Sequence, residues 1–301
     1  MALQPRVYEV DERFGWRHKP GAQVTQHTPQ YTATYTIGSD GDRIVPGSPD
    51  SGTTVSFLGC SFCFGLGVND DEVFSSIIQR EYWKGCRLRN LGCIAYGTSH
   101  VLLRLQDEVR AGRKTDLAIY CWMWHHRFRN YRRRGWLKFM THIKPCKNPL
   151  HEVERGQLVF KGLIGVDQSL DDNDPTLPHL EDQVTYALLK AIRALCQEHG
   201  IRLVVVMYPF VLASGPAGEV SDRKMVSDCR SLGIEYLDLT RCTALTDPAD
   251  YYPNDGHPKA SWHEVVARLI AEGVDPTTGR VRSHTPSSQR GDRTDNRRTP
   301  Y

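Results

Sequence analysis

The sequence predicts a three-layer α/β/α domain around a parallel sheet of about five strands. Short apolar runs alternate with segments of helical spacing between residues 53 and 274, as expected for a parallel sheet covered on both faces. The chain has 301 residues, of which 40% are hydrophobic, so it can bury one large core. Residues 1–52 are rich in Thr, Gly, Pro and Asp, and we expect them to form an arm packed on this domain.

The first half of the domain contains three predicted strands and two predicted helices. Residues 53–59 are apolar and β-branched and end in glycine, which indicates a buried strand. Residues 70–82 have helical spacing and open with acids, which favour the positive end of a helix. A strand at 86–91, a helix at 98–109 with a Thr or Ser cap, and a strand at 116–123 complete this half.

The same alternation resumes after an interruption. Residues 124–175 read as an insertion, in which a basic, aromatic stretch precedes a hairpin near 157–166. Beyond it the pattern predicts, in order, a helix at 181–199, a strand at 202–208, a helix at 221–232, a strand at 235–239 and a helix at 260–272. The domain should end near residue 274. Residues 275–301 contain few apolar side chains, so we expect a disordered basic tail.

Ser61 and His257 are the candidate reactive pair. Ser61 follows the first strand, and parallel sheets place their sites at the carboxyl ends of strands. A serine hydroxyl needs an adjacent base to act as a nucleophile. His257 offers one, and Asp255 could orient the imidazole. Either residue alone is more often an ordinary loop residue, but the two together at opposite ends of the domain favour nucleophilic chemistry.

Three stretches resemble, in the right order, the sequence blocks of the SGNH (GDSL-type) hydrolase superfamily. Residues 57–69 are similar to the first block, in which Gly-Asp-Ser carries the nucleophile. Residues 90–99 resemble the second block, and residues 254–267 resemble the last block, which holds Asp and His before the final helix. The resemblance covers about residues 12–273. It implies a flavodoxin-like sheet and a catalytic triad of Ser61, His257 and Asp255.

The chain departs from this family pattern at three places. Cys60 stands where the family has Asp before the serine, a position that is not the triad acid. Asp255 is two residues before His257, whereas three is the commonest spacing, and Asn254 there cannot supply the charge. The third block normally gives an oxyanion-hole Asn from Gly-x-Asn-Asp, and residues 121–130 contain no such motif.

The third departure concerns the oxyanion hole of the implied site. The resemblance places backbone N–H donors at Ser61 and at Ala95, with Gly97 as the neighbouring option. The side chains that could replace the missing Asn are His125, His126 and Asn130. Loss of one oxyanion donor typically costs ~10²–10³-fold in rate.

The resemblance implies an esterase or deacylase that forms an acyl-enzyme and requires no cofactor. Its substrate would be a small-molecule or carbohydrate acyl ester. Two alternatives stay open: an O-acyltransferase that uses the same triad, and a catalytically weak binding protein on the same fold.

A basic, aromatic stretch bears on the substrate's charge. Residues 127–147 hold eight Lys and Arg residues and no acid. Such a stretch could bind an anionic group of the substrate, or it could simply be a solvated element that covers the site. The net charge of +3 does not favour a nucleic-acid partner.

Cysteine spacing and hydropathy bear on metals and location. Cys60 and Cys63 form a C-x2-C without a second pair at zinc-binding distance, so we expect no metal site. The N-terminus carries acids early, and no segment approaches the ~20 apolar residues of a membrane span. These features favour a reduced, cytoplasmic protein.

Overall fold

A five-stranded parallel sheet forms the centre of the molecule in the computed structural model, which describes residues 7–141, 147–209 and 216–282. Its strands are β5 (Thr54–Gly59), β6 (Arg87–Asn90), β7 (Leu117–Trp122), β10 (Arg202–Met207) and β11 (Glu235–Asp238). Their spatial order is β11-β10-β7-β5-β6, and every neighbouring pair is parallel. The predicted fold class is confirmed, and the order is the flavodoxin-like one.

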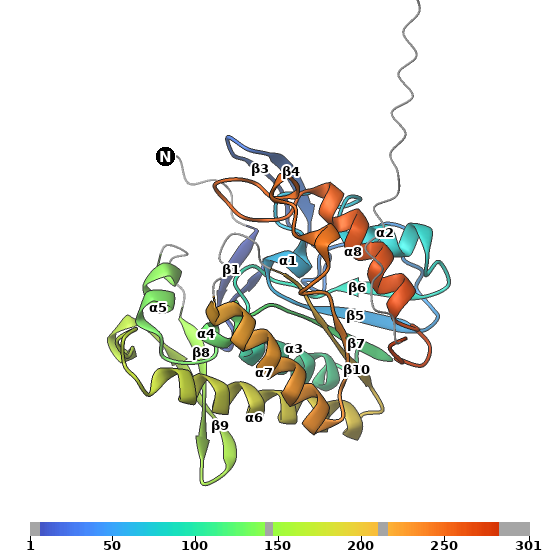
Figure 1. The fold of residues 1–301 in the computed structure, drawn as a ribbon. Helices are drawn as coiled ribbons and strands as arrows, with labels where there is room; N and C mark the ends of the chain where they lie inside the picture. The colour runs from blue at the N-terminus through green and yellow to red at the C-terminus, as the bar shows by residue number, and fades with distance from the viewer. Residues whose placement is uncertain (1–6, 142–146, 210–215, 283–301) are drawn as a thin grey trace, which may run out of the picture.

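Helices cover both faces of this sheet (Figure 1). On one face α2 (Phe74–Glu81) packs against α8 (Ala260–Gly273). The other face carries α3 (Thr98–Arg110), α6 (Leu177–Glu198) and α7 (Pro216–Leu232). Strands β5 and β7 are buried along their whole length between the two layers, which explains their continuous apolar sequences.

Helix α2 begins four residues later than the acids at its start predict. Asp70 is not in the first turn, because its carboxylate pairs with Arg43 at 2.9 Å and accepts the backbone N–H of Thr36. The helix therefore starts at Phe74, whose N–H donates to Nδ1 of the buried His263.

The insertion forms two short helices and a hairpin. These are α4 (His125–Arg129), α5 (Arg134–Met140), β8 (Asn148–Glu154) and β9 (Gln157–Ile164), followed by a 3₁₀ turn at Val166–Gln168. The hairpin packs on α6. Four arginines of the basic stretch form ion pairs with later carboxylates: Arg127 with Asp182, Arg132 with Glu152, Arg133 with Glu181 and Arg134 with Asp171.

The N-terminal arm consists of two hairpins that lie on the domain. They pair β1 (Tyr8–Asp11) with β2 (Gly15–His18) and β3 (Gln23–His27) with β4 (Thr32–Thr36). Side chains of the second hairpin pack on Phe64, just after the candidate nucleophile. In the first hairpin, the Trp16 indole donates to the Ile94 carbonyl, and the Tyr96 hydroxyl donates to the Trp16 carbonyl.

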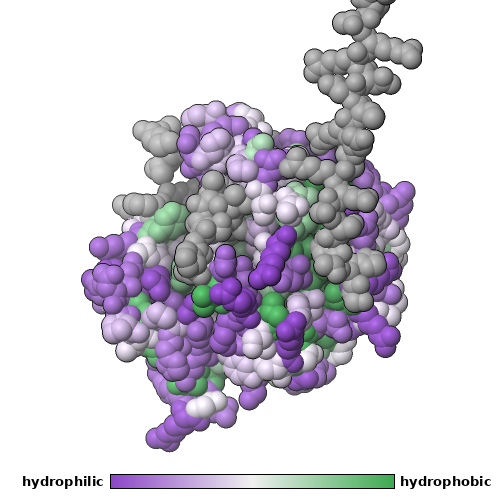
Figure 2. All heavy atoms as spheres, in the orientation of Figure 1, coloured by the Kyte–Doolittle hydropathy of each residue, from purple (hydrophilic) through white to green (hydrophobic). Residues whose placement is uncertain are grey.

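The end of the domain extends beyond the expected boundary. Residues 275–282 return to the domain through a bridge between Val274 and Val281, while 283–301, most of the expected tail, lie outside the described residues. Two further 3₁₀ turns, Thr243–Leu245 and Pro248–Asp250, precede α8. The face over α6 and α7 is mainly hydrophilic (Figure 2). Among the described helices, none combines the length and apolarity needed to cross a bilayer.

Candidate active site

Ser61 lies at the carboxyl end of β5, where the chain turns directly into the short helix α1 (Ser61–Phe64). The strand order changes direction at this point, since β6 lies on one side of β5 and the remaining strands lie on the other. Gly65 ends α1 with a φ of 83°, a conformation that glycine adopts without strain. The side chain of Ser61 is thereby held at the carboxyl end of the sheet.

His257 and Asp255 meet Ser61 in one hydrogen-bonded chain. The Ser61 Oγ lies 2.8 Å from His257 Nε2, and His257 Nδ1 lies 2.7 Å from Asp255 Oδ1. Gly256 between them has a φ of 75°, so the tight turn brings both side chains to the same side. Phe62 packs near the imidazole, with ring centroids 5.6 Å apart. This arrangement matches the requirement of a serine nucleophile for an oriented base.

The arm supplies a further partner to the carboxylate. Burial by itself would raise the pKa of Asp255, but hydrogen bonds from His257 and Tyr31 hold it below its ordinary value. Tyr31 in turn packs against Tyr252, with ring centroids 4.8 Å apart. Asp255 therefore stays ionised beside the histidine, as orientation of an imidazole requires.

Arg43 secures the loop that follows Ser61. Its side chain is fully buried and donates to the backbone carbonyls of Phe64, Gly65 and Val68 at 2.6–2.7 Å. It also pairs with Asp70. A buried cation with this many acceptors fixes the position of the loop.

The loop after β6 brings a second backbone toward Ser61. Gly92 packs so closely on α1 that a Cβ there would lie 2.5 Å from the Phe64 nitrogen. Ala95 has a φ of 68°, a strained conformation for a non-glycine residue. Among the described residues, the N–H groups of Ser61 and Ala95 have no hydrogen-bond partner, whereas that of Gly97 donates to His100 Nδ1 at 3.1 Å. Ala95 is thus the better candidate donor.

The structure gives other tasks to the side chains expected to replace the third-block Asn. Asn130 caps α3: its Oδ1 accepts the N–H of Thr98 at 2.8 Å, and its Nδ2 donates to the hydroxyls of Thr98 and Thr185. The Nδ1 of the buried His126 bonds to the Tyr120 hydroxyl at 2.8 Å. His125 packs on Trp124, and burial together with Arg129 lowers the pKa of His125 to about 3.

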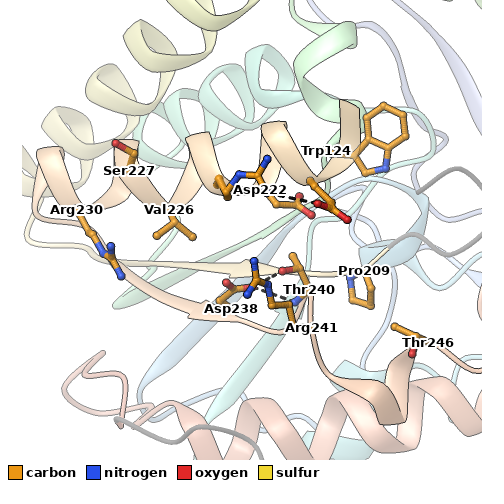
Figure 3. Close-up of a pocket in the computed structure, with 13 residues that line it drawn as sticks. Trp124, Pro209, Asp222, Val226, Ser227, Arg230, Asp238, Thr240, Arg241 and Thr246 are labelled. Atoms are coloured by element: carbon orange, nitrogen blue, oxygen red, sulfur yellow. Dashed lines mark hydrogen bonds and ion pairs between the residues drawn. The ribbon is translucent and has the colours of Figure 1, made fainter. Parts of the chain in front are cut away.

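A cavity of about 730 Å³ lies beside the carboxyl ends of β10 and β11. In Figure 3, α7 forms one side, the segment after β11 forms the other, and Trp124 and Pro209 lie at one end. Two buried polar atoms of this lining, Trp124 Nε1 and Asp222 Oδ1, have no partner among the described residues. Burial, together with Asp238 and Glu219, raises the pKa of Asp222 to about 7. None of the three residues Ser61, Asp255 and His257 lines the cavity.

Sequence reasoning identified the hydrogen-bonded chain but not its supports. Residues 39–43, which end in Arg43, resemble the lead-in of many bacterial members of the family, but that resemblance does not show what Arg43 contacts. Tyr31 and Arg129 carry no local pattern that relates them to Ser61, because their contacts depend on how distant segments fold together. Among the described residues, no group of three His, Cys, Asp or Glu side chains could hold a metal ion.

Comparisons with known proteins give structural matches at low sequence identity. No protein-family model and no curated protein matches the chain. The structure is similar to a lipolytic protein of the G-D-S-L family from Desulfitobacterium hafniense (13% identity, TM-score 0.46, 73% of this chain and 99% of that chain). It is also similar to the esterase EstA from Pseudoalteromonas (12%, 0.47, 73% and 96%) and to a catalytic mutant of the acetylxylan esterase Axe2 from Geobacillus stearothermophilus (14%, 0.47, 79% and 100%).

Proposed function

We propose that this chain is a serine-dependent ester hydrolase with Ser61 as its nucleophile. The observation that carries the proposal is the continuous chain Ser61 Oγ–His257 Nε2 (2.8 Å) and His257 Nδ1–Asp255 Oδ1 (2.7 Å). Residues almost 200 positions apart come into hydrogen-bond contact at the carboxyl end of a central strand. A loop serine with a purely structural role needs neither this base nor the carboxylate behind it.

The proposed reaction is acyl transfer in two steps. His257 accepts the Ser61 proton while Oγ attacks the ester carbonyl, and the same proton then passes to the departing alcohol. Water next gives a proton to His257 and attacks the acyl-enzyme, which releases the acid and restores the serine. Asp255 keeps the imidazole oriented and stabilises its protonated form.

The carbonyl oxygen becomes negative in both steps. In this proposal, the backbone N–H groups of Ser61 and Ala95 stabilise that charge. The strained φ of 68° at Ala95 supports this assignment, because such strain persists where the surrounding structure imposes it, often at functional sites.

We infer that the alcohol half of the substrate is polar, as in an acylated carbohydrate. The cavity beside β10 is at the same carboxyl edge of the parallel sheet as Ser61, although Ser61, His257 and Asp255 do not line it. Its volume is within the ~300–1,000 Å³ typical of small-molecule sites. Its lining contains the carboxyl groups of Glu219, Asp222 and Asp238 and the guanidinium groups of Arg223, Arg230 and Arg241, which offer acceptors and donors to a polar ligand. The ion pairs of the basic stretch leave an anionic substrate group without support from those four arginines.

A fluorophosphonate probe tests the nucleophile. Labelling is measured from about pH 6 to 9, where a histidine base can be neutral. We expect the wild type and the control Ser261→Ala to be labelled and Ser61→Ala to remain unlabelled. Ser261 bonds to Asp250 and has no part in the proposed chemistry. A wild type that resists labelling at every pH would refute the proposal.

Short p-nitrophenyl esters then separate hydrolysis from transfer. A hydrolase releases free acid at a rate that added alcohols or sugars leave unchanged. An acyltransferase would instead form a new ester with the acceptor, and a binding protein would turn over neither. Acylated and plain oligosaccharides compared in the same assay test the polar alcohol half.

A further inference from the structure

We propose that Arg129 is a positioning residue for the proposed oxyanion donors Ser61 and Ala95. It supplies a positive charge in the segment where the family pattern has a neutral Asn donor. The inference rests on the proposed ester hydrolysis at Ser61. Arg129 ends α4, in the segment that follows β7 where the family pattern is missing.

The guanidinium of Arg129 joins the two loops that carry the proposed oxyanion donors. Its Nη1 donates to the carbonyl of Tyr96 at 2.9 Å, one residue after Ala95. It also interacts with the thiol of Cys60, one residue before Ser61. The indole of Trp136 covers it, with 4.8 Å from Cζ to the ring centroid. One side chain therefore contacts both the segment before Ser61 and the segment after Ala95.

Arg129 differs from its neighbours because its charge is not neutralised. Arg127 and Arg133 pair with Asp182 and Glu181 at 2.8 and 2.7 Å. No described carboxylate pairs with Arg129, and its Nε is buried without a hydrogen-bond partner in the part of the chain that the structure describes. A half-buried cation without a carboxylate partner is costly, because it loses part of its hydration without gaining an ion pair. An anion that forms only during the reaction would compensate it.

The negative charge of the tetrahedral state develops beside Ser61 and Ala95. A cation next to both residues favours that state over the neutral ester, and a low-dielectric surrounding strengthens the attraction. The charge remains on Arg129 throughout, since arginine stays protonated in proteins. The effect should therefore appear in kcat much more than in KM.

The test compares Arg129→Met and Arg129→Lys with the control Arg127→Met, which changes the same helix at a paired arginine. The measurements are kcat and KM for p-nitrophenyl acetate and the affinity for phenylboronic acid, which forms an anionic tetrahedral adduct with a reactive serine. For Arg129→Met we expect kcat to fall about 10–100-fold with KM within about threefold, and boronate affinity to fall in parallel. Arg129→Lys should recover part of both losses, and Arg127→Met should stay within about twofold of wild type.

Three results would overturn the inference. They are an Arg129→Met protein with kcat within about threefold of wild type, a kcat loss without any loss of boronate affinity, and an equal loss in Arg127→Met. If Arg129→Met does not fold, Arg129→Gln, which can still donate to Tyr96 but has no charge, replaces it in the same comparison. A wild type without Ser61 reactivity overturns both proposals, whereas an active wild type with an unaffected Arg129→Met overturns this one alone.

Discussion

Two arginines, the buried Arg43 and the half-buried Arg129, contact the segments on either side of Ser61, and their contacts differ. Arg43 lies in the arm and uses its charge on Asp70 and three carbonyls of the nucleophile loop. Arg129 has one carbonyl and a thiol, and no described carboxylate pairs with it. The difference indicates that the loop after Ser61 is held by an arginine whose charge is paired. The segment around Ala95 and Tyr96 is contacted by an arginine whose charge has no described carboxylate partner.

Removal of Arg43 should have the largest effect on stability. Arg43→Met leaves Asp70 and three buried carbonyls without their cation, and breaking a buried pair typically costs ~3–5 kcal/mol. Urea unfolding should show this loss, and the activity of the folded protein should fall as well, because the loop after Ser61 loses its buried support. The control is Arg80→Met, which breaks an exposed pair with Glu81 and should cost less than ~1 kcal/mol. A loss from Arg43→Met as small as that of the control would contradict the assigned role.

Acid should have the next largest effect, and it should destabilise the region of α3 and α4 more than the region of α1 and α2. Burial lowers the pKa of His18 and His263, on the nucleophile side, to about 3. Four more histidines with lowered pKa values lie in or next to α3 and α4: His100, His125, His126 and His151. The unfolded chain binds protons at these groups near pH 6.5 and the folded chain does not, so stability falls as pH drops below 6.5 toward their folded pKa values. In that pH range, each group lowers the free energy of unfolding by ~1.4 kcal/mol for each pH unit of acidification.

Hydrogen exchange between pH 6.5 and 5 measures this difference. We expect protection in α3 and α4 to decrease before protection in α1 and α2, because four of the six histidines lie on that side. A uniform loss across both regions would mean that the molecule responds to acid as one unit.

The same contrast shows what the sequence could and could not predict. The sheet and its helices follow from local periodicity, and Ser61, His257 and Asp255 follow from their places at a strand end and a glycine turn. Arg43 lies in the acidic, glycine-containing segment 38–43 and Arg129 in the basic, aromatic stretch, and neither sequence shows which partners the arginine contacts. Only the contacts in the folded chain show that Arg43 has a carboxylate partner, since Asp70 is 27 residues away in the sequence.

Four other arginines of the basic stretch, Arg127, Arg132, Arg133 and Arg134, make the same point. They are neutralised by carboxylates from the β8 strand, α6 and the loop between them, 20 to 55 residues further on. Residue counting could not pair them. Residue counting also could not show that Asn130, which its position made a candidate oxyanion donor, uses its amide to cap the start of α3.

Tyr31→Phe should have the smallest effect, and it tests whether the arm influences chemistry as well as packing. The hydroxyl of Tyr31 helps to hold the pKa of Asp255 low, so its loss should raise that pKa and move the acidic limit of activity to higher pH. Loss of about 1 kcal/mol of orientation corresponds to a kcat about three- to tenfold lower. Tyr236→Phe, which loses a hydrogen bond from Arg230 far from Ser61, is the matched control. An unchanged pH profile in Tyr31→Phe would confine the arm to a packing role.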